Sequence, residues 1–198
     1  MSSRRPVTGR LRSHRLRWLK ALLPTAAAGR LGRRIFSMSE AEAARVTSAC
    51  LQAVPGVLLA GGWGVEALGP RRRRRHFDLD LVLPPSARAA AVEALAGVGY
   101  HVAVPRSPGG WWSEWVVVLR NAAGRVTELV IVEDAVLAAL MERAAAAVAG
   151  DPGTTLGCLA GLSLPCLSPG LQLVLHSGYR LNRSQRFDLR FLRRVAGQ

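Results

Sequence analysis

The stretch AGGWGVEALGPRRRRRHFDLDLVL, residues 60–83, carries most of the information about the fold. In its last seven residues, apolar side chains alternate with two aspartates up to Leu81, which is the period of a strand with two unlike faces. This alternation places Asp78 and Asp80 together on one face. The opposite face is apolar and is expected to point into a core: Phe77, Leu79, Leu81 and Leu83.

Two carboxylates on one strand face lie about 7 Å apart and repel each other when both are ionised. In a half-buried site, a divalent cation bound by both would offset the repulsion, and Mg²⁺ takes oxygen ligands of this kind. The alternative is a pair of solvent-facing aspartates on an edge strand. Asp78 and Asp80 are therefore candidate metal ligands. The neighbouring residues must show whether they form a metal site or simply face solvent.

A third acid, Glu128, lies among apolar residues in RVTELVIV, residues 125–132. An acid inside such a strand is costly to bury unless it has a partner. If this strand pairs beside residues 77–83, Glu128 can complete a cluster of three carboxylates with Asp78 and Asp80. An exposed acid on an edge strand is the alternative.

The turn before the acidic strand is built from Gly61 and Gly62. Glycines after a strand let backbone N–H groups approach phosphates closely. The block Arg71–Arg75 follows and leads directly into His76. Five like charges at this place fit three uses: a nucleic-acid contact, a solvated loop, or a collar around the phosphates of a nucleotide.

The chain alternates between strands and helices, and the strands expected at 115–120 and 125–132 form a hairpin, so the predicted fold is α+β with a mixed sheet. We expect a small mixed β-sheet with flanking helices, followed by a helical C-terminal part. The expected division is a basic N-terminal extension at 1–37, a core at 38–150 and a helical subdomain at 151–198. Strands are predicted at 57–60, 77–83, 100–104, 115–120 and 125–132, and helices at 39–53, 86–98, 133–149, from 168, and at 184–196.

The net charge of +14 is unevenly distributed along the 198 residues. Of the 27 Lys and Arg, ten lie in residues 1–39 and five in the arginine block, which leaves 12 against 13 Asp and Glu. The basic N-terminal extension could contact nucleic acid or a membrane surface, act as a targeting segment or stay disordered. A capping box of Ser39 and Glu42 follows Met38, so we expect the functional protein to begin near Met38.

The composition disfavours a membrane span, a disulfide framework and a zinc site. No apolar run reaches the ~18–20 residues that span a bilayer. The three cysteines, Cys50, Cys158 and Cys166, form no CxxC pair, which disfavours a disulfide framework or a zinc site and fits a reducing cytoplasm.

The motifs GGWGVEAL and RRRHFDLDLVL together resemble the small antibiotic nucleotidyltransferases. These are the lincosamide and aminoglycoside 2″-type adenylyltransferases of the DNA polymerase β-like nucleotidyltransferase superfamily. Their pattern is a GGW turn and helix, an Arg-x-His-x-Asp-x-Asp strand and a third carboxylate on a later strand. CLSPGLQLVLHSGYRLNRSQRFDLRFL, residues 166–192, is similar to the family's C-terminal helical stretch. The resemblance covers the chain from Met38 to its end.

The resemblance implies that Asp78, Asp80 and Glu128 bind Mg²⁺, with Glu128 as third ligand or as general base for the acceptor hydroxyl. It implies nucleotide binding by four further residues: Gly61, Gly62, Arg74 and His76. Three positions depart from the family pattern, since Glu66 and Glu128 stand for Asp and Val130 for His.

The implied activity is transfer of a nucleoside monophosphate, AMP from ATP being favoured, to a hydroxyl of a small molecule such as an aminoglycoside or lincosamide-like antibiotic. Acids for a cationic acceptor are few: Glu114, Glu133, Asp134 and Asp188. An aromatic lip at residues 109–115 could cover the acceptor. The alternative function is a catalytically weak protein that binds RNA or another polyanion through the basic extension and the arginine block. A toxin-type enzyme that modifies RNA or protein would keep the chemistry and change the acceptor.

Overall fold

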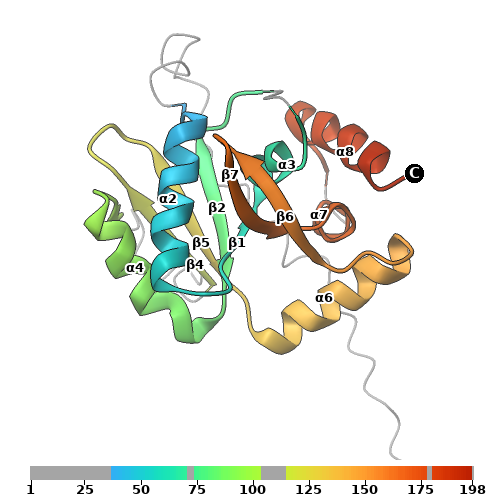
Figure 1. The fold of residues 1–198 in the computed structure, drawn as a ribbon, viewed down its shortest axis with the longest axis horizontal. Helices are drawn as coiled ribbons and strands as arrows, with labels where there is room; N and C mark the ends of the chain where they lie inside the picture. The colour runs from blue at the N-terminus through green and yellow to red at the C-terminus, as the bar shows by residue number, and fades with distance from the viewer. Residues whose placement is uncertain (1–36, 71–73, 104–114, 178–179, 198) are drawn as a thin grey trace, which may run out of the picture.

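The computed structural model describes residues 37–70, 74–103, 115–177 and 180–197 (Figure 1). Within these ranges the strands are β1 (Leu58–Ala60), β2 (Asp78–Leu83), β3 (His101–Val102), β4 (Val116–Arg120), β5 (Val126–Ile131), β6 (Thr154–Leu159) and β7 (Leu162–Leu167). The α-helices are α2 (Glu40–Ala53), α3 (Gly61–Ala67), α4 (Arg88–Gly97), α6 (Asp134–Ala147), α7 (Pro169–Leu175) and α8 (Arg183–Val195), and a 3-10 turn, η2, spans Pro85–Ala87. None of these helices is long and apolar enough to cross a bilayer.

All seven strands form one mixed sheet in the order β3-β4-β5-β2-β1-β7-β6. The central strand β2 pairs antiparallel with β1 and parallel with β5. β5 pairs antiparallel with β4, and β1 pairs parallel with β7. The predicted α+β fold with a small mixed sheet and flanking helices is therefore confirmed.

The two faces of the sheet are covered by different helices. One face carries the larger core, in which Leu79, Leu81 and Leu129 pack with residues of α2 and α4. The other face carries a smaller core, in which Leu58 and Val82 pack with residues of α6 and α7. Figure 1 shows α2 and α4 side by side over the first face, with α6, α7 and α8 grouped on the other side of the molecule.

Local sequence signals set several element boundaries. The Ser39 side chain accepts a hydrogen bond from the Glu42 backbone N–H, so α2 begins where the capping signal predicts. Ser168 caps α7 in the same way, and Pro169 occupies its first turn. The strands predicted at 115–120 and 125–132 form the expected antiparallel pair, β4 and β5.

The helical part predicted from residue 151 onward is wrong for residues 154–167. These residues form the hairpin β6–β7, which joins the sheet through the pairing of β7 with β1. The turn consists of Ala160 and Gly161, both with positive φ (49° and 79°), which suits a two-residue hairpin. The alternation that signals a strand is interrupted by Gly157 and Pro165. The helical C-terminal part begins only at Pro169.

Candidate functional site

The three predicted carboxylates lie on two neighbouring parallel strands. Asp80 in β2 stands directly opposite Glu128 in β5, and Asp78 stands opposite Val126. Since side chains alternate along a strand and residues in register point to one side, Asp78, Asp80 and Glu128 share a face of the sheet. This is the face opposite α2 and α4. The pairing that the cluster requires is confirmed.

Glu128 is the buried member of this group, with 9% of its surface exposed, while the two aspartates are half-buried. Burial and, to a smaller extent, the Asp78 charge raise the pKa of the Glu128 carboxyl from 4.5 to about 7, against the opposing effect of Arg120. Negative charge at this end of β2 and β5 is therefore only partly compensated.

The carboxylates of Asp78, Asp80 and Glu128 are of the type that binds a divalent cation, although they do not converge on a single metal position in this structure. In the described ranges no three His, Cys, Asp or Glu side chains converge into a metal-binding arrangement. The donors are carboxylate oxygens, which Mg²⁺ prefers, and a bound cation would offset the charge that raises the pKa of Glu128. Asp78, Asp80 and Glu128 fit Mg²⁺ by type and charge, and their side chains would have to turn toward it.

The Gly61–Gly62 turn opens α3 beside these carboxylates. Gly61 has a positive φ of 57°, and a Cβ there would lie 1.8 Å from Asp80 Oδ2. A Cβ at Gly62 would lie 2.2 Å from His76 Nδ1 and 2.7 Å from Arg74 Nη2. Both glycines allow side chains of the Arg74–Asp80 segment to approach the turn. Their predicted contact with phosphates stays a prediction.

His76 and Arg74, the other predicted nucleotide ligands, both contact buried acids. His76 is 1% exposed, and its Nε2 lies 3.0 Å from Glu66 Oε1. Burial lowers the pKa of His76, an effect opposed by the hydrogen bond to Glu66. Because a carboxylate oxygen accepts, Nε2 is the donor in this bond. The ring also contacts Trp63, with ring centroids 4.7 Å apart.

The Arg74 guanidinium binds Asp188 of α8. Nε donates to both carboxylate oxygens at 3.0 and 3.1 Å, and Nη2 donates to Oδ2 at 2.6 Å. Asp188 is 1% exposed. It is therefore the internal partner of Arg74, and its predicted use as a pocket acid for a cationic acceptor is wrong because an arginine already neutralises it.

Two residues of this arrangement were not predicted in their observed roles. The family pattern marks Glu66 only as a departure from Asp, whereas in the structure it joins the His76 ring to the Arg74 backbone N–H. Asp188 could have been placed by periodicity, since it follows Gln185 and precedes Leu192 on the buried face of α8. A buried acid on such a face indicates that a cationic partner is present, but the sequence does not show which residue that partner is. The aromatic lip lies outside the described residues except for Trp115, which is 44% exposed.

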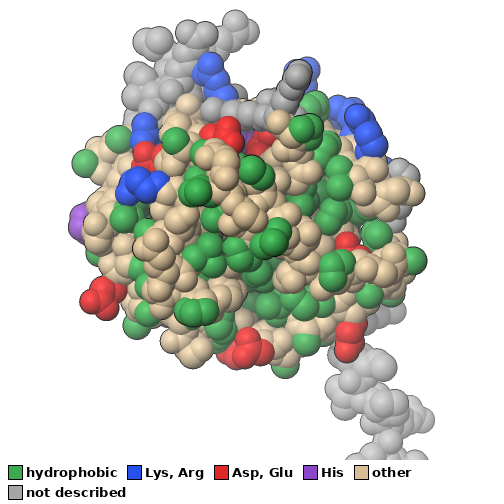
Figure 2. Space-filling model, in the orientation of Figure 1, with side chains coloured by type: hydrophobic (Ala, Val, Ile, Leu, Met, Phe, Trp, Pro, Cys, Tyr) green, Lys and Arg blue, Asp and Glu red, His purple; other side chains and the backbone are tan. Residues whose placement is uncertain are grey.

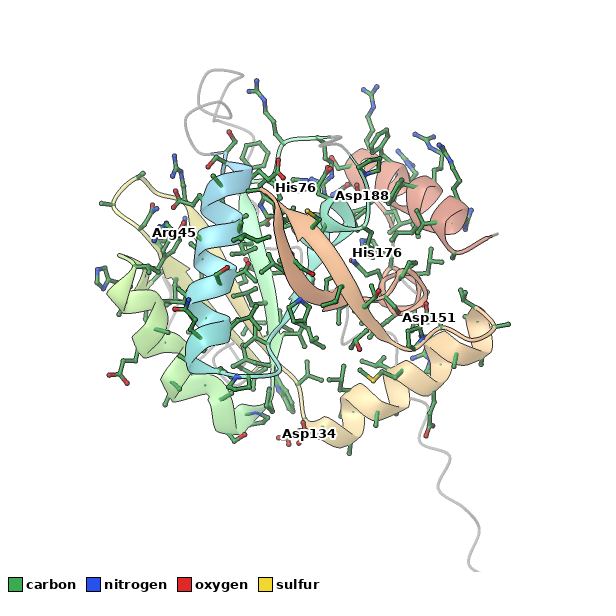
Figure 3. The ribbon with its side chains drawn as sticks, in the orientation of Figure 1. Arg45, His76, Asp134, Asp151, His176 and Asp188 are labelled. Carbon is green, nitrogen blue, oxygen red and sulfur yellow. The ribbon has the colours of Figure 1, made fainter. Side chains whose placement is uncertain are left out.

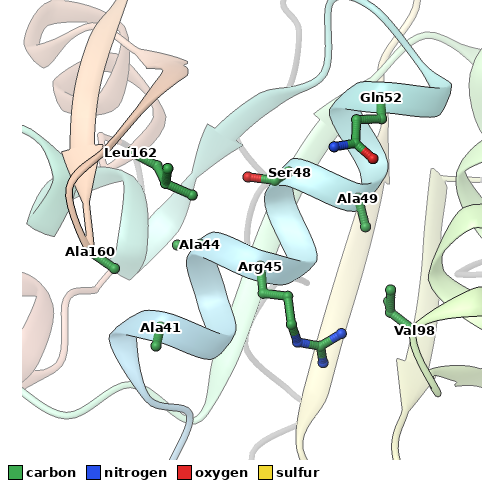
Figure 4. Close-up of a pocket in the computed structure, with 9 residues that line it drawn as sticks. All are labelled: Ala41, Ala44, Arg45, Ser48, Ala49, Gln52, Val98, Ala160 and Leu162. Atoms are coloured by element: carbon green, nitrogen blue, oxygen red, sulfur yellow. The ribbon is translucent and has the colours of Figure 1, made fainter.

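A separate groove of about 490 Å³ runs along the outer side of α2 (Figure 4). Its charged lining residue is Arg45, and the rest is small or uncharged: Ala41, Ala44, Ser48, Ala49, Gln52, Val98, Ala160 and Leu162. It lies on the helix that covers the face opposite the carboxylates. The groove therefore offers no acid–base or metal chemistry to the site.

Known proteins share both the sequence pattern and the architecture. The pattern of the aminoglycoside-2″-adenylyltransferase family matches residues 44–192. A lincosamide resistance protein of Staphylococcus haemolyticus is 23% identical over 139 residues, which cover 69% of this chain and 83% of that protein.

Solved structures of a lincosamide antibiotic adenylyltransferase, LnuA, and of an antibiotic-resistance factor, ANT(2″)-Ia, share the fold. That of LnuA with bound lincomycin matches with a TM-score of 0.50 at 20% identity and covers 70% of this chain and 86% of LnuA. That of ANT(2″)-Ia in complex with adenylyl-2″-tobramycin matches with a TM-score of 0.56 at 14% identity and covers 78% and 87% of the two chains. With the family match over most of its length, the chain is a nucleotidyltransferase that belongs to the aminoglycoside-2″-adenylyltransferase family.

Proposed function

We propose that the protein transfers AMP from ATP, in a Mg²⁺-dependent reaction, to a hydroxyl group of an aminoglycoside- or lincosamide-like antibiotic. The observation that carries the proposal is the register of β2 and β5, which puts Asp80 opposite Glu128 with Asp78 on the same face. The acceptor class is inferred from the relatives, one of which is a lincosamide resistance protein. Another has been solved with adenylyl-2″-tobramycin.

In the proposed reaction, the bond from the acceptor oxygen to the α-phosphorus forms while the bond from that phosphorus to the leaving oxygen breaks. The electron pair leaves with pyrophosphate, and the acceptor hydroxyl loses its proton. Bound Mg²⁺ would stabilise the charge that develops on the phosphates. Asp78 and Asp80 are the proposed ligands of that cation.

Glu128 is the proposed third carboxylate, as a further metal ligand or as the acceptor of the hydroxyl proton. A pKa of about 7 suits a general base near neutral pH, because it combines a large ionised fraction with adequate basicity. A bound cation would lower this pKa and increase the ionised fraction of Glu128.

Gly61, Gly62, Arg74 and His76 are the proposed surroundings of the triphosphate. In support, the Arg74 and His76 side chains lie against Gly62, and Gly61 lies against Asp80. The four residues therefore border one region of the site beside Asp80. Because the Arg74 guanidinium binds Asp188 and the His76 ring binds Glu66, a phosphate would have to share these groups with their internal partners.

We place the reaction in the cytoplasm, where ATP is available and thiols such as Cys50 stay reduced. The predicted nucleic-acid contact of residues 1–37 rests on charge alone and forms no part of the proposed reaction.

The proposal is tested by calorimetric titration of ATP and of GTP, with and without Mg²⁺, into the full chain. The Asp78→Asn/Asp80→Asn double variant is compared with Glu93→Gln/Glu142→Gln, which removes two exposed acids elsewhere. Mg²⁺-dependent binding of ATP that only the aspartate variant loses supports the proposal. Pyrophosphate release with tobramycin or lincomycin as acceptor then tests the transfer. A wild-type chain that binds neither triphosphate contradicts the proposal.

A further inference from the structure

Asp188 is a buried acid in an otherwise basic helix. The only other charged residues of α8 are arginines, and all of them are exposed: Arg183, Arg186, Arg190, Arg193 and Arg194. Figure 2 shows basic side chains on the surface in the part of the view where Figure 1 shows α8. Asp188 instead points inward and binds the Arg74 guanidinium, which lies 114 residues away in sequence. A buried carboxylate is costly unless a cation and hydrogen bonds compensate it, so this pairing fixes where Arg74 lies.

A second buried acid fixes the backbone of the same segment. Glu66, 3% exposed in α3, accepts a hydrogen bond from the Arg74 backbone N–H at 3.0 Å and another from His76. Arg74 is thus held by its side chain from α8 and by its backbone from α3. Figure 3 shows Asp188 and His76 at the same end of the molecule, and the Asp188 charge acts on the His76 ring.

The segment held in this way leads directly into the carboxylate strand. Arg74 and His76 lie against Gly62, and Asp78 follows His76 by two residues. With the His76 ring and the Arg74 guanidinium in contact with Gly62, the start of β2 is fixed relative to the turn. The position of Asp78 and Asp80 beside Gly61 and Gly62 therefore depends on the two buried acids.

We propose that Asp188 is a positioning residue of the nucleotide site, which acts through Arg74 to hold the segment from Arg74 to Asp80 against the Gly61–Gly62 turn. The inference rests on the proposed function of this turn and these aspartates. On this proposal, the C-terminal helix α8 supports the nucleotide site through Asp188, although Asp188 itself touches neither nucleotide nor acceptor. The competing reading is that the ion pair only attaches α8 to the rest of the fold.

The test needs a control that weakens the fold equally at another place. Glu42 of α2 supplies it, because it pairs with Arg125 and accepts hydrogen bonds from Tyr100 and Asn121. This network joins α2 to the β4–β5 turn and contacts none of the proposed site residues. Glu42→Gln and Asp188→Asn each remove one carboxylate charge from an internal ion pair while they preserve the shape of the side chain.

Binding of Mg²⁺·ATP to the full chain is measured by calorimetry at a temperature where circular dichroism shows every variant folded. We expect Asp188→Asn to weaken binding by roughly 10- to 100-fold, as for the loss of a partner that orients a ligand residue, while Glu42→Gln leaves it unchanged. Equal affinities of the two variants overturn the positioning role. A wild-type chain that does not bind ATP instead overturns the proposed function, and the positioning role with it.

A second variant covers the case in which Asp188→Asn fails to fold, as can follow the loss of one member of a buried ion pair. Arg74→Lys keeps the charge but cannot form the paired contacts of a guanidinium with a carboxylate, so we expect it to weaken Mg²⁺·ATP binding as well. Unchanged affinity of Arg74→Lys overturns the positioning role without any use of Asp188→Asn. Where Asp188→Asn does fold, the double variant adds a second test: if Asp188 acts through Arg74, Arg74→Lys/Asp188→Asn binds no more weakly than the weaker single variant. Losses that simply add in the double variant overturn this route.

Discussion

The six residues of β2 alternate between two faces of the sheet, and the two faces differ in what they contribute to the protein. Leu79 and Leu81 are completely buried among apolar side chains from α2 and α4, and their burial stabilises the fold. Asp78 and Asp80 face the other way, beside Glu128, whose pKa is raised by its burial and by the Asp78 charge. One face of the strand therefore contributes stability over its whole length, while the other combines the apolar Val82 with acidic side chains beside the partly compensated Glu128. Substitutions on one face should leave the property of the other unchanged.

The largest expected effect is on activity, from Asp78→Asn/Asp80→Asn. Loss of both proposed metal ligands should reduce pyrophosphate release about 10³-fold or more. The variant also removes the repulsion of Glu128, so its free energy of unfolding in urea should stay within about 1 kcal/mol of wild type. Retained activity would mean that the carboxylate face has another role.

The opposite outcome is expected from Leu83→Ala on the apolar face. Leu83 is 2% exposed in the larger core, and its truncation should lower the free energy of unfolding by about 2–5 kcal/mol. The affinity for Mg²⁺·ATP, measured where the variant is folded, should equal that of wild type. A large loss of affinity would show that the two faces are not independent.

The pH dependence of stability tests the charge on the carboxylate face. Below pH 4.5 Glu128 is protonated in both the folded and the unfolded chain. Between pH 4.5 and about 7 the unfolded chain loses this proton while the folded chain keeps it, so stability falls as pH rises. The total loss should be about 3 kcal/mol, and above pH 7 no further loss arises from this group.

Urea unfolding of wild type and Glu128→Gln at several pH values measures this effect. The difference in stability between the two proteins isolates Glu128 from the other acids, which titrate in both. We expect wild type to lose stability relative to the variant as pH rises from 5 to 7. A difference that does not change with pH would mean that Glu128 ionises as an ordinary exposed acid does.

The sequence was sufficient to predict the carboxylate face, because period-two alternation is a local pattern. The helix starts at Ser39 and Ser168 were predictable for the same reason, since capping signals are local. Asp78 and Asp80 share a face as predicted, and Glu128 lies opposite Asp80 because the two strands pair. The partners of Arg74 and His76 could not be predicted in this way. Asp188 lies 114 residues beyond Arg74, and no local pattern says which cation an inward-facing acid meets. The hairpin of residues 154–167 has no clear sequence signal, because Gly157 and Pro165 interrupt its alternation.

The smallest expected effect is that of one methyl group at the place where the turn meets the acidic strand. In Gly62→Ala the new Cβ would lie 2.2 Å from His76 Nδ1, an atom that forms no hydrogen bond with any described residue. The ring must move, which also disturbs its contact with Glu66. We expect a loss of about 1–3 kcal/mol in stability and a weaker affinity for Mg²⁺·ATP.

Gly97→Ala at the end of α4 is the matched control for Gly62→Ala. A Cβ at Gly97 meets nothing within 4 Å, and alanine favours helix over glycine, so this variant should be as stable as wild type or slightly more so. If Gly62→Ala lowers stability without changing affinity, the contact of His76 with the turn belongs to the fold alone. If affinity falls as well, the turn and the acidic strand form one site, since Gly62 lies outside β2 and the side chains nearest to it, His76 and Arg74, belong to the segment that leads into Asp78.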